Sequence, residues 1–303
     1  MGFDRTTILR GPAKITFDGA TFYSKGGVAI TFQNITFDKE TDAYGVVGKG
    51  KTDVQILVEF EPVGELESLT VLFPYGNTAI GSKIYGSSDK ALVVVAADAT
   101  YTIKNAAITQ MPSLRLTATN TAFGSVQFTG LLDLATGEPD DPTSYFTVGA
   151  GASIGTAFDP ALIVASGYSG LLGDADFYTE AGFDITFDLA LNPMTVDGFG
   201  TVGMTLSNVG ASISFIPTGV GADFFDALFI DGAVMGADPG AQSLTLTSIA
   251  GDGLVVAFPL VNMTDMQHRF SPTENRLGQV NLTAKRTFNA GAQTALFGVS
   301  INT

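Results

Sequence analysis

The stretch VAITFQNITF at residues 28–37, followed by DVQILVEFE at residues 53–61, decides the fold class. In both segments apolar side chains recur at every second position, which is the period of a β-strand with one buried face. The alternation changes parity after Asn34, and this change predicts a β-bulge or a twist. Residues 38–51, which are polar and glycine-rich, predict the turn of a long hairpin that projects from the body.

The same pattern returns 155 residues later in the chain. Ile30-Thr31-Phe32 aligns with Ile185-Thr186-Phe187, and residues 3–64 share 18 identities with residues 158–219 over 62 ungapped positions. Later segments match with small shifts: Leu92–Val94 with Leu254–Val256, and Phe123–Thr129 with Leu277–Thr283. The repeat predicts two tandem copies of one domain, residues 1–132 and residues 158–303, joined by a linker at residues 133–157.

Each predicted copy combines several strands with one short helix. The helices are expected at Gly64–Phe73 and Gly221–Phe229, where apolar side chains recur at helical spacing and acidic residues lie in the first turn. Further strands are expected at Ala91–Ala97, Ser113–Thr119, Gly124–Leu131, Ser243–Leu246, Gly253–Pro259 and Leu277–Ala284. The predicted fold class is mainly β, with each copy a β-sandwich or barrel flanked by its helix.

Composition narrows the range of functions. The 303 residues have a net charge of −15, and no Lys or Arg occurs from Leu116 to His268. Nucleic-acid readers need basic side chains to neutralise phosphates, so DNA recognition is not expected, although the acidic balance also serves solubility. The chain has no cysteine, so it forms no disulfides. It shows no secretion signal and no apolar run of about 20 residues that would span a membrane.

Residues for catalysis or metal binding are scarce. His268 is the single histidine, and no nucleophile motif accompanies it, so we expect a surface histidine and no enzyme activity, metal site or cofactor. Gly48-Lys49-Gly50-Lys51 is interpreted as a solvated turn in preference to a phosphate site. Asp140-Asp141 is interpreted as part of a solvated linker in preference to a cation contact. Three Asn-x-Thr triplets match the glycan acceptor pattern, which arises often by chance in Thr-rich sequence.

In its paired hairpins (Val28–Glu61 and Phe183–Phe215), the helix that follows each Phe-x-Pro, and its closing strands, the chain resembles a known family. It is similar to the major tail tube protein of long-tailed, siphovirus-type bacteriophages, in the variant with a duplicated domain. This resemblance implies β-sandwich domains whose sheets join into a continuous channel. It also implies rings that stack around a tape-measure protein, and a genome that later passes through the lumen.

The resemblance further implies homotrimeric, pseudo-hexameric rings that contact tail-terminator and baseplate or tip proteins and pass double-stranded DNA without sequence preference. The expected location is the virion tail, assembled in the host bacterial cytoplasm without membrane insertion. A DNA conduit should repel phosphates, so polar strand faces are the candidate lining. The candidate lining residues are Asp53, Gln55, Glu59, Glu61, Asn208, Ser212 and Ser214.

Three alternatives stay open from the sequence. These polar faces could form the outer surface of the protein and not a lumen. A secreted, surface-layer or adhesin-type module would share Thr- and Gly-rich strands and low charge, but should carry a secretion signal. A sandwich-fold enzyme acting on glycans would need aromatic platforms, and the chain has no Trp.

Overall fold

The structure is a computed structural model, which describes residues 13–85, 90–97, 99–117, 121–132, 141–152, 154, 167–197, 199–218, 220–228, 242–249, 253–270, 275–286, 288–289 and 292–302. The fold is mainly β, as predicted, with two large antiparallel sheets. The first half of the chain contributes β1 (Lys14–Phe17), β2 (Ala20–Thr41), β3 (Gly45–Val63), α1 (Leu66–Leu69), η2 (Thr70–Leu72), β4 (Lys83–Tyr85), β5 (Leu92–Val95), β6 (Ala99–Ile103), β7 (Ala106–Gln110), β8 (Leu114–Leu116), β9 (Thr121–Phe123) and β10 (Val126–Gly130). The rest contributes η4 (Pro142–Ser144), β11 (Phe146–Ala150), β12 (Tyr168–Leu172), β13 (Ala175–Val196), β14 (Gly200–Thr218), α2 (Ala222–Leu228), β15 (Gln242–Ser248), β16 (Gly253–Phe270), β17 (Asn275–Ala284), β18 (Phe288–Asn289), β19 (Ala292–Gln293) and β20 (Gly298–Asn302).

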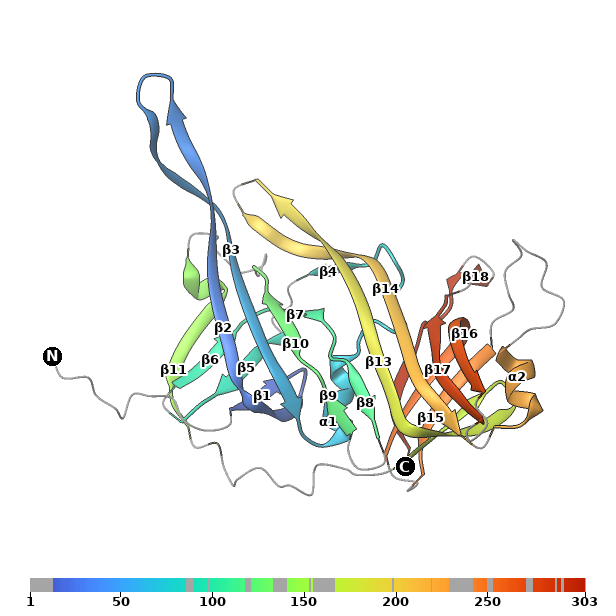
Figure 1. Ribbon diagram of the computed structural model, residues 1–303. Coiled ribbons are helices and arrows are strands. Elements are labelled where there is room, and N and C mark those ends of the chain that lie inside the picture. The colour runs from blue at the N-terminus through green and yellow to red at the C-terminus, as the bar shows by residue number, and fades with distance from the viewer. Residues whose placement is uncertain are drawn as a thin grey trace.

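Two long hairpins, β2–β3 and β13–β14, rise from the sheets as projecting arms (Figure 1). The predicted turn at residues 38–51 is wrong in extent, because the strands continue to Thr41 and resume at Gly45. Tyr44 N donates to Thr41 O at 3.3 Å, and Gly45 takes a positive φ of 65° that closes this short turn. The predicted irregularity after Asn34 is confirmed, since the register shifts between Ile35 and Thr36.

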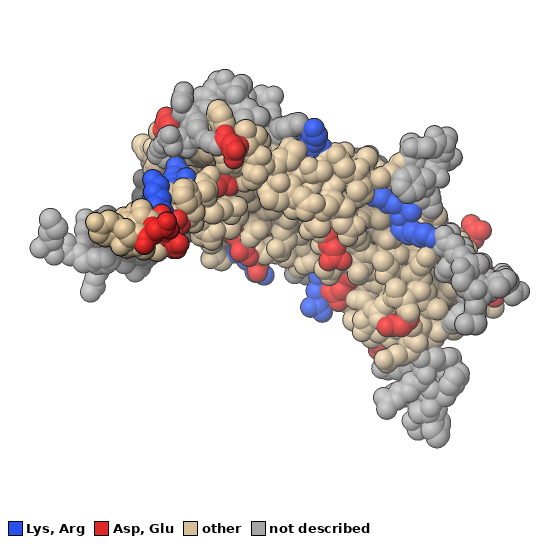
Figure 2. All heavy atoms as spheres, turned by 90° about the horizontal axis from the view of Figure 1, so that it is seen from above, with Lys and Arg blue, Asp and Glu red and all other residues tan. Residues whose placement is uncertain are grey.

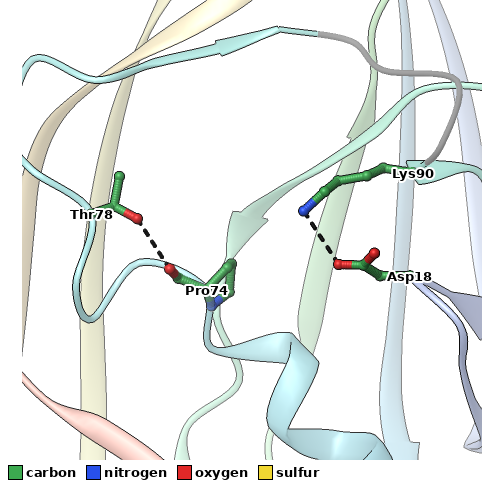
Figure 3. Close-up of polar contacts among 4 residues, drawn as sticks. All are labelled: Asp18, Pro74, Thr78 and Lys90. Carbon is green, nitrogen blue, oxygen red and sulfur yellow. Dashed lines mark hydrogen bonds and ion pairs between the residues drawn. The ribbon is translucent and has the colours of Figure 1, made fainter.

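The two predicted helices are present and short. Leu66, Leu69 and Leu72 of α1 and η2 are buried, as are Phe224 and Leu228 of α2. The chain leaves η2 through a turn in which Thr78 Oγ1 donates to Pro74 O at 3.1 Å (Figure 3). No helix among the described residues is long and apolar enough to cross a membrane.

The sheets share an order of strands. The first runs β11-β6-β5-β1-β2-β3-β10-β7, and the second contains β15-β12-β13-β14-β17 in the same relation as β5-β1-β2-β3-β10. This correspondence overturns one predicted match. Leu92–Val94 belongs to β5, which pairs with β1, whereas Leu254–Val256 lies in β16, two places away from β12. Local apolar similarity aligned two strands that occupy different places in the sheets.

In the part of the chain that the structure describes, the second sheet closes on itself, whereas the first stays open. β16 pairs with both β15 and β17, and β13 pairs with β14, so the ladder returns to its start. In the first sheet the corresponding path is divided into β6 and β7, which pair with β5 and β10 respectively. The break falls at Lys104 and Asn105, where Lys104 N donates to Tyr145 O at 3.0 Å.

Strands cross the predicted domain boundaries. β4 pairs with β14 and β8 pairs with β13, so segments of residues 1–132 extend the second sheet. β11, inside the predicted linker at residues 133–157, pairs with β6 at the edge of the first sheet. The linker's composition predicted solvated turns, but Phe146–Ala150 also contains apolar residues and adds a strand. Asp140 lies outside the described residues.

The two halves share one apolar core. Phe73, which follows η2, packs against Phe187 of β13 with ring centroids 5.3 Å apart, and Phe187 packs against Phe297 at 4.7 Å. All three are buried. Burying such rings contributes roughly 2–3 kcal/mol each, so this junction holds the two sheets together.

Candidate functional site

The candidate lining residues of the first sheet lie along β3. Glu59 and Glu61 are exposed and Gln55 is half-buried, on the face opposite the buried Ile56, Val58 and Phe60. Glu59 accepts a hydrogen bond from Ser125 Oγ at 2.8 Å, and Lys25 Nζ lies 3.9 Å from a Glu61 carboxylate oxygen. Strand alternation thus places these three polar side chains on one face, as predicted.

Asp53 departs from this prediction. Its side chain is buried, 9% exposed, where β3 meets the start of β14. Thr201 Oγ1 donates to Asp53 Oδ2 at 2.5 Å, and Val54 N donates to Asp53 Oδ1 at 2.8 Å. A Cβ at Gly200 would overlap Asp53 Oδ1, so the glycine allows this approach. Asp53 therefore joins the two arms and does not face open solvent, which periodicity within β3 could not reveal.

The candidates of the second sheet lie along β14. Asn208 and Ser212 are exposed and Ser214 is half-buried. Ser214 pairs with Asp184 of β13 on one side and with Asn281 of β17 on the other. The face therefore extends over neighbouring strands that the sequence analysis did not include.

A row of polar residues crosses this sheet at the level of Ser214. Arg115 Nε lies 3.5 Å from Asp184 Oδ1, and Asn281 Nδ2 donates to Asp265 Oδ1 at 2.6 Å. Gln279 Nε2 also donates to Asn281 Oδ1 at 2.8 Å. Only the alignment of strands in three dimensions brings these residues into one row, because they come from β8, β13, β17 and β16.

Charged side chains gather on the first arm, where Asp38, Lys39, Glu40, Asp42, Lys49 and Lys51 are all exposed. Most of the remaining surface seen from above is uncharged (Figure 2). Lys49 Nζ lies 3.7 Å from Asp38 Oδ1 on the first arm. Within the described part of the chain, no cluster of three or more His, Cys, Asp or Glu side chains has the arrangement of a metal site. The first arm thus carries charges of both signs, whereas the rest of the surface in this view is mostly uncharged.

A groove of about 610 Å³ separates the arms. Ile35 and Phe37 of β2 line one side, and Val196 and Phe199 line the other, with Asp53 among the lining residues. These four apolar side chains are 40–50% exposed. The arms therefore present apolar surface as well as polar strand faces.

The remaining sequence candidates have ordinary structural positions. Gly48–Lys51 lies within β3 and not in a turn, which corrects that interpretation. Thr143 N and Oγ1 donate to the Asp141 carboxylate at 2.8 and 2.6 Å, and these hydrogen bonds lower the pKa of Asp141. His268 pairs with Leu277 in the β16–β17 ladder.

Neither a scan against protein-family models nor a search of curated proteins finds a match to this chain.

Proposed function

We propose that the chain is a structural subunit that assembles with copies of itself into stacked rings, forming a phage-type tail tube that conducts a genome into the host. The observation that carries the proposal is the joining of two sheets of matching strand order through strands of the first half that pair into the second sheet, β4 on β14 and β8 on β13. A junction of this kind, repeated between chains, extends a sheet from one subunit to the next.

Ring formation follows from this architecture. A head-to-tail interface that is repeated with a fixed rotation closes into a ring when the rotation divides a full turn. With two similar sheets in each chain, three chains provide six quasi-equivalent units. The projecting arms, β2–β3 and β13–β14, supply additional surface for contacts within or between rings (Figure 1).

The polar strand faces supply a suitable lining for the conduit. Glu59, Glu61, Asn208 and Ser212 are exposed, and none of them carries a positive charge. The basic residues beside these faces, Lys25 and Arg115, lie next to the carboxylates of Glu61 and Asp184. A wall whose basic side chains are paired with carboxylates in this way releases few counterions from DNA, so passing DNA would gain little affinity for it. We propose that double-stranded DNA passes without sequence-specific contacts, after a tape-measure protein has occupied the lumen during assembly.

In this proposal the chain is not an enzyme and requires no cofactor. Tail-terminator and baseplate or tip proteins would contact the end rings, and the chain would belong to the virion after assembly in the bacterial cytoplasm. These partners follow from the tail-tube proposal.

Electron microscopy of the purified protein over a concentration series tests the proposal. We expect hollow rings or tubes whose end views show threefold or pseudo-sixfold symmetry. Monodisperse chains at every concentration, including after addition of preformed tail-tip complexes as initiators, would contradict it and favour an isolated surface-type module. Binding of the monodisperse chain to a carbohydrate panel would then identify that alternative.

A further inference from the structure

Within the chain, β8 docks on β13 in a defined way. Leu116, Arg115 and Leu114 pair with Phe183, Asp184 and Ile185, extending the second sheet on the outer edge of β13. The two leucines are buried, at 0–1% exposure, and so are Phe183 and Ile185. Gly182 immediately precedes the segment of β13 that pairs with β8. It has a φ of 93°, and a Cβ there would overlap the carbonyl oxygen of Leu116. The glycine thus admits the end of the docked strand.

Among the described residues, no strand lies on the equivalent edge of the first sheet. Shifting Phe183–Ile185 by 155 residues gives Val28–Ile30 of β2, preceded by Gly27 with a φ of 109°. A Cβ at Gly27 would meet no atom within 4 Å. Val28 and Ile30 are only partly buried and Ala29 is exposed. Among the described residues, β3 is the one strand that pairs with this part of β2.

A second pair of equivalent glycines differs in the same way: one has a neighbouring side chain against its Cβ position and the other does not. Gly200, at the start of β14, has Asp53 of β3 against it, whereas Gly45, at the start of β3, has open space around its Cβ position. The residue of β14 that corresponds to Asp53 is Asn208, which is exposed. β3 contacts the second sheet at Gly200, and β8 contacts it at Phe183–Ile185. The equivalent positions of the first sheet, Gly45 and Val28–Ile30, have no such contact among the described residues.

The strand that fits the unpaired edge of Val28–Ile30 lies at the end of β16. In the β8–β9 pair, Leu114, Arg115 and Leu116 lie opposite Phe123, Ala122 and Thr121. In the β16–β17 pair, His268, Arg269 and Phe270 lie opposite Leu277, Arg276 and Asn275. A shift of 154 residues relates the two pairs, as it relates Val126 and Val280, which lie opposite Phe60 and Phe215. The end of β16 is therefore the register equivalent of β8.

We propose that His268–Phe270 of one copy pairs antiparallel with the outer edge of Val28–Ile30 in a second copy, with Arg269 opposite Ala29. β2 and β16 lie on opposite sides of the molecule, so the partner must be another chain (Figure 1). An edge strand with unpaired N–H and C=O groups is a template for such pairing. The inference rests on the proposed ring assembly and names the surfaces that meet in it.

Engineered disulfides test this register, because the chain has no cysteine of its own. Residues directly opposite in an antiparallel pair have Cα atoms about 4.5–5.5 Å apart, within the range for a disulfide. Under mild oxidation at assembling concentrations, Ala29→Cys with Arg269→Cys should give ladders of linked chains on a non-reducing gel. Arg115→Cys with Asp184→Cys, the equivalent pair inside one chain, should link without joining chains. Thr31→Cys with Arg269→Cys, a diagonal pair about 7–8 Å apart, should link several-fold less.

The outcomes separate this inference from the proposed function. Rings or tubes in which the 29/269 pair stays unlinked, while the 115/184 pair links, would overturn the inference and leave the tube proposal standing. Linked ladders from chains that never form rings or tubes would support the pairing and contradict the tube. Chains that neither associate nor link at 29/269 would contradict both.

Discussion

Thr201 Oγ1 donates a hydrogen bond to the buried carboxylate of Asp53 across the junction of the two arms, at 2.5 Å. Its donor and acceptor are 148 residues apart in the sequence. Thr201→Val removes the hydroxyl and leaves the carboxylate with fewer hydrogen bonds. We expect the free energy of unfolding to fall by about 1–3 kcal/mol, as for a hydrogen bond to a buried charged group.

Urea denaturation of the unassembled chain measures this loss. Thr36→Val, at an exposed position of β2, is the matched control and should change stability by less than about 0.5 kcal/mol. Equal effects from the two substitutions would mean that the bond to Asp53 does not stabilise the junction.

Arg286, which follows β17 of the second sheet, forms hydrogen bonds to the loop after η2. Its guanidinium donates to the carbonyl oxygens of Thr78 at 2.7 Å, Tyr75 at 3.0 Å and Gly76 at 3.3 Å, and burial lowers its pKa. Arg286→Ala should cost about 2–4 kcal/mol, because several partly buried carbonyl groups lose a charged donor. Arg286→Lys should recover only part of this loss, since an ammonium group lacks the planar fork.

Arg115→Ala provides the comparison in thermal or urea unfolding. The Arg115 side chain is 65% exposed and its ion pair with Asp184 should contribute no more than about 1 kcal/mol. If Arg286→Ala lowered the free energy of unfolding by less than Arg115→Ala, the hydrogen bonds of Arg286 would not stabilise the contact between the loop and the second sheet.

The buried hydroxyl of Tyr75 should make the free energy of unfolding fall at alkaline pH. Its hydroxyl donates to Ile108 O at 2.7 Å, and burial raises its pKa above the ordinary value of about 10. The unfolded chain then releases this proton more readily than the folded chain. The Tyr75 contribution is complete below pH about 10 and is lost as the pH rises above that value.

Tyr75→Phe isolates this effect. At pH 7 it should cost about 1 kcal/mol for the lost hydrogen bond. Above pH about 10 the difference in unfolding free energy between the two proteins should shrink, as measured by urea titrations at several pH values. A difference that stays constant with pH would refute the prediction.

Gly182 and Gly27 should respond differently to the same substitution. Both take a positive φ, so alanine strains the backbone at either site, by roughly 1–3 kcal/mol. Only at position 182 would the new Cβ also overlap Leu116 O. In the unassembled chain Gly182→Ala should therefore destabilise clearly more than Gly27→Ala, as differential scanning calorimetry would measure. Equal destabilisation would show that the approach of β8 imposes no requirement at Gly182.

The lining role of Glu59 can be tested by accessibility. In a chain without native cysteine, Glu59→Cys introduces a single thiol on the exposed face of β3. We expect a small maleimide to react with this thiol in both free chains and tubes. A maleimide on a polymer wider than the lumen should react with free chains but slowly with tubes. Equally fast reaction with the large reagent in both states would place Glu59 on the outer surface.

The sequence by itself determined the mainly β fold, the two long hairpins, the short helices and the bulge after Asn34. These features are local, because alternation of apolar side chains fixes which face of a strand is buried. For the same reason the polar faces of Glu59, Glu61 and Ser212 could be predicted. The same alternation wrongly assigned Asp53 to that exposed polar face. The pattern of one strand contains no information about a contact with Thr201 of another strand.

Only the tertiary structure decided how the halves are joined. Docking of β8 on β13, addition of β11 to the first sheet and the place of Leu254–Val256 in β16 all depend on contacts between distant segments. Short apolar strands such as these fit several edges equally well by composition. Their place is selected by backbone hydrogen bonding and by close approaches such as Leu116 to Gly182, which exist only after the sheets have formed.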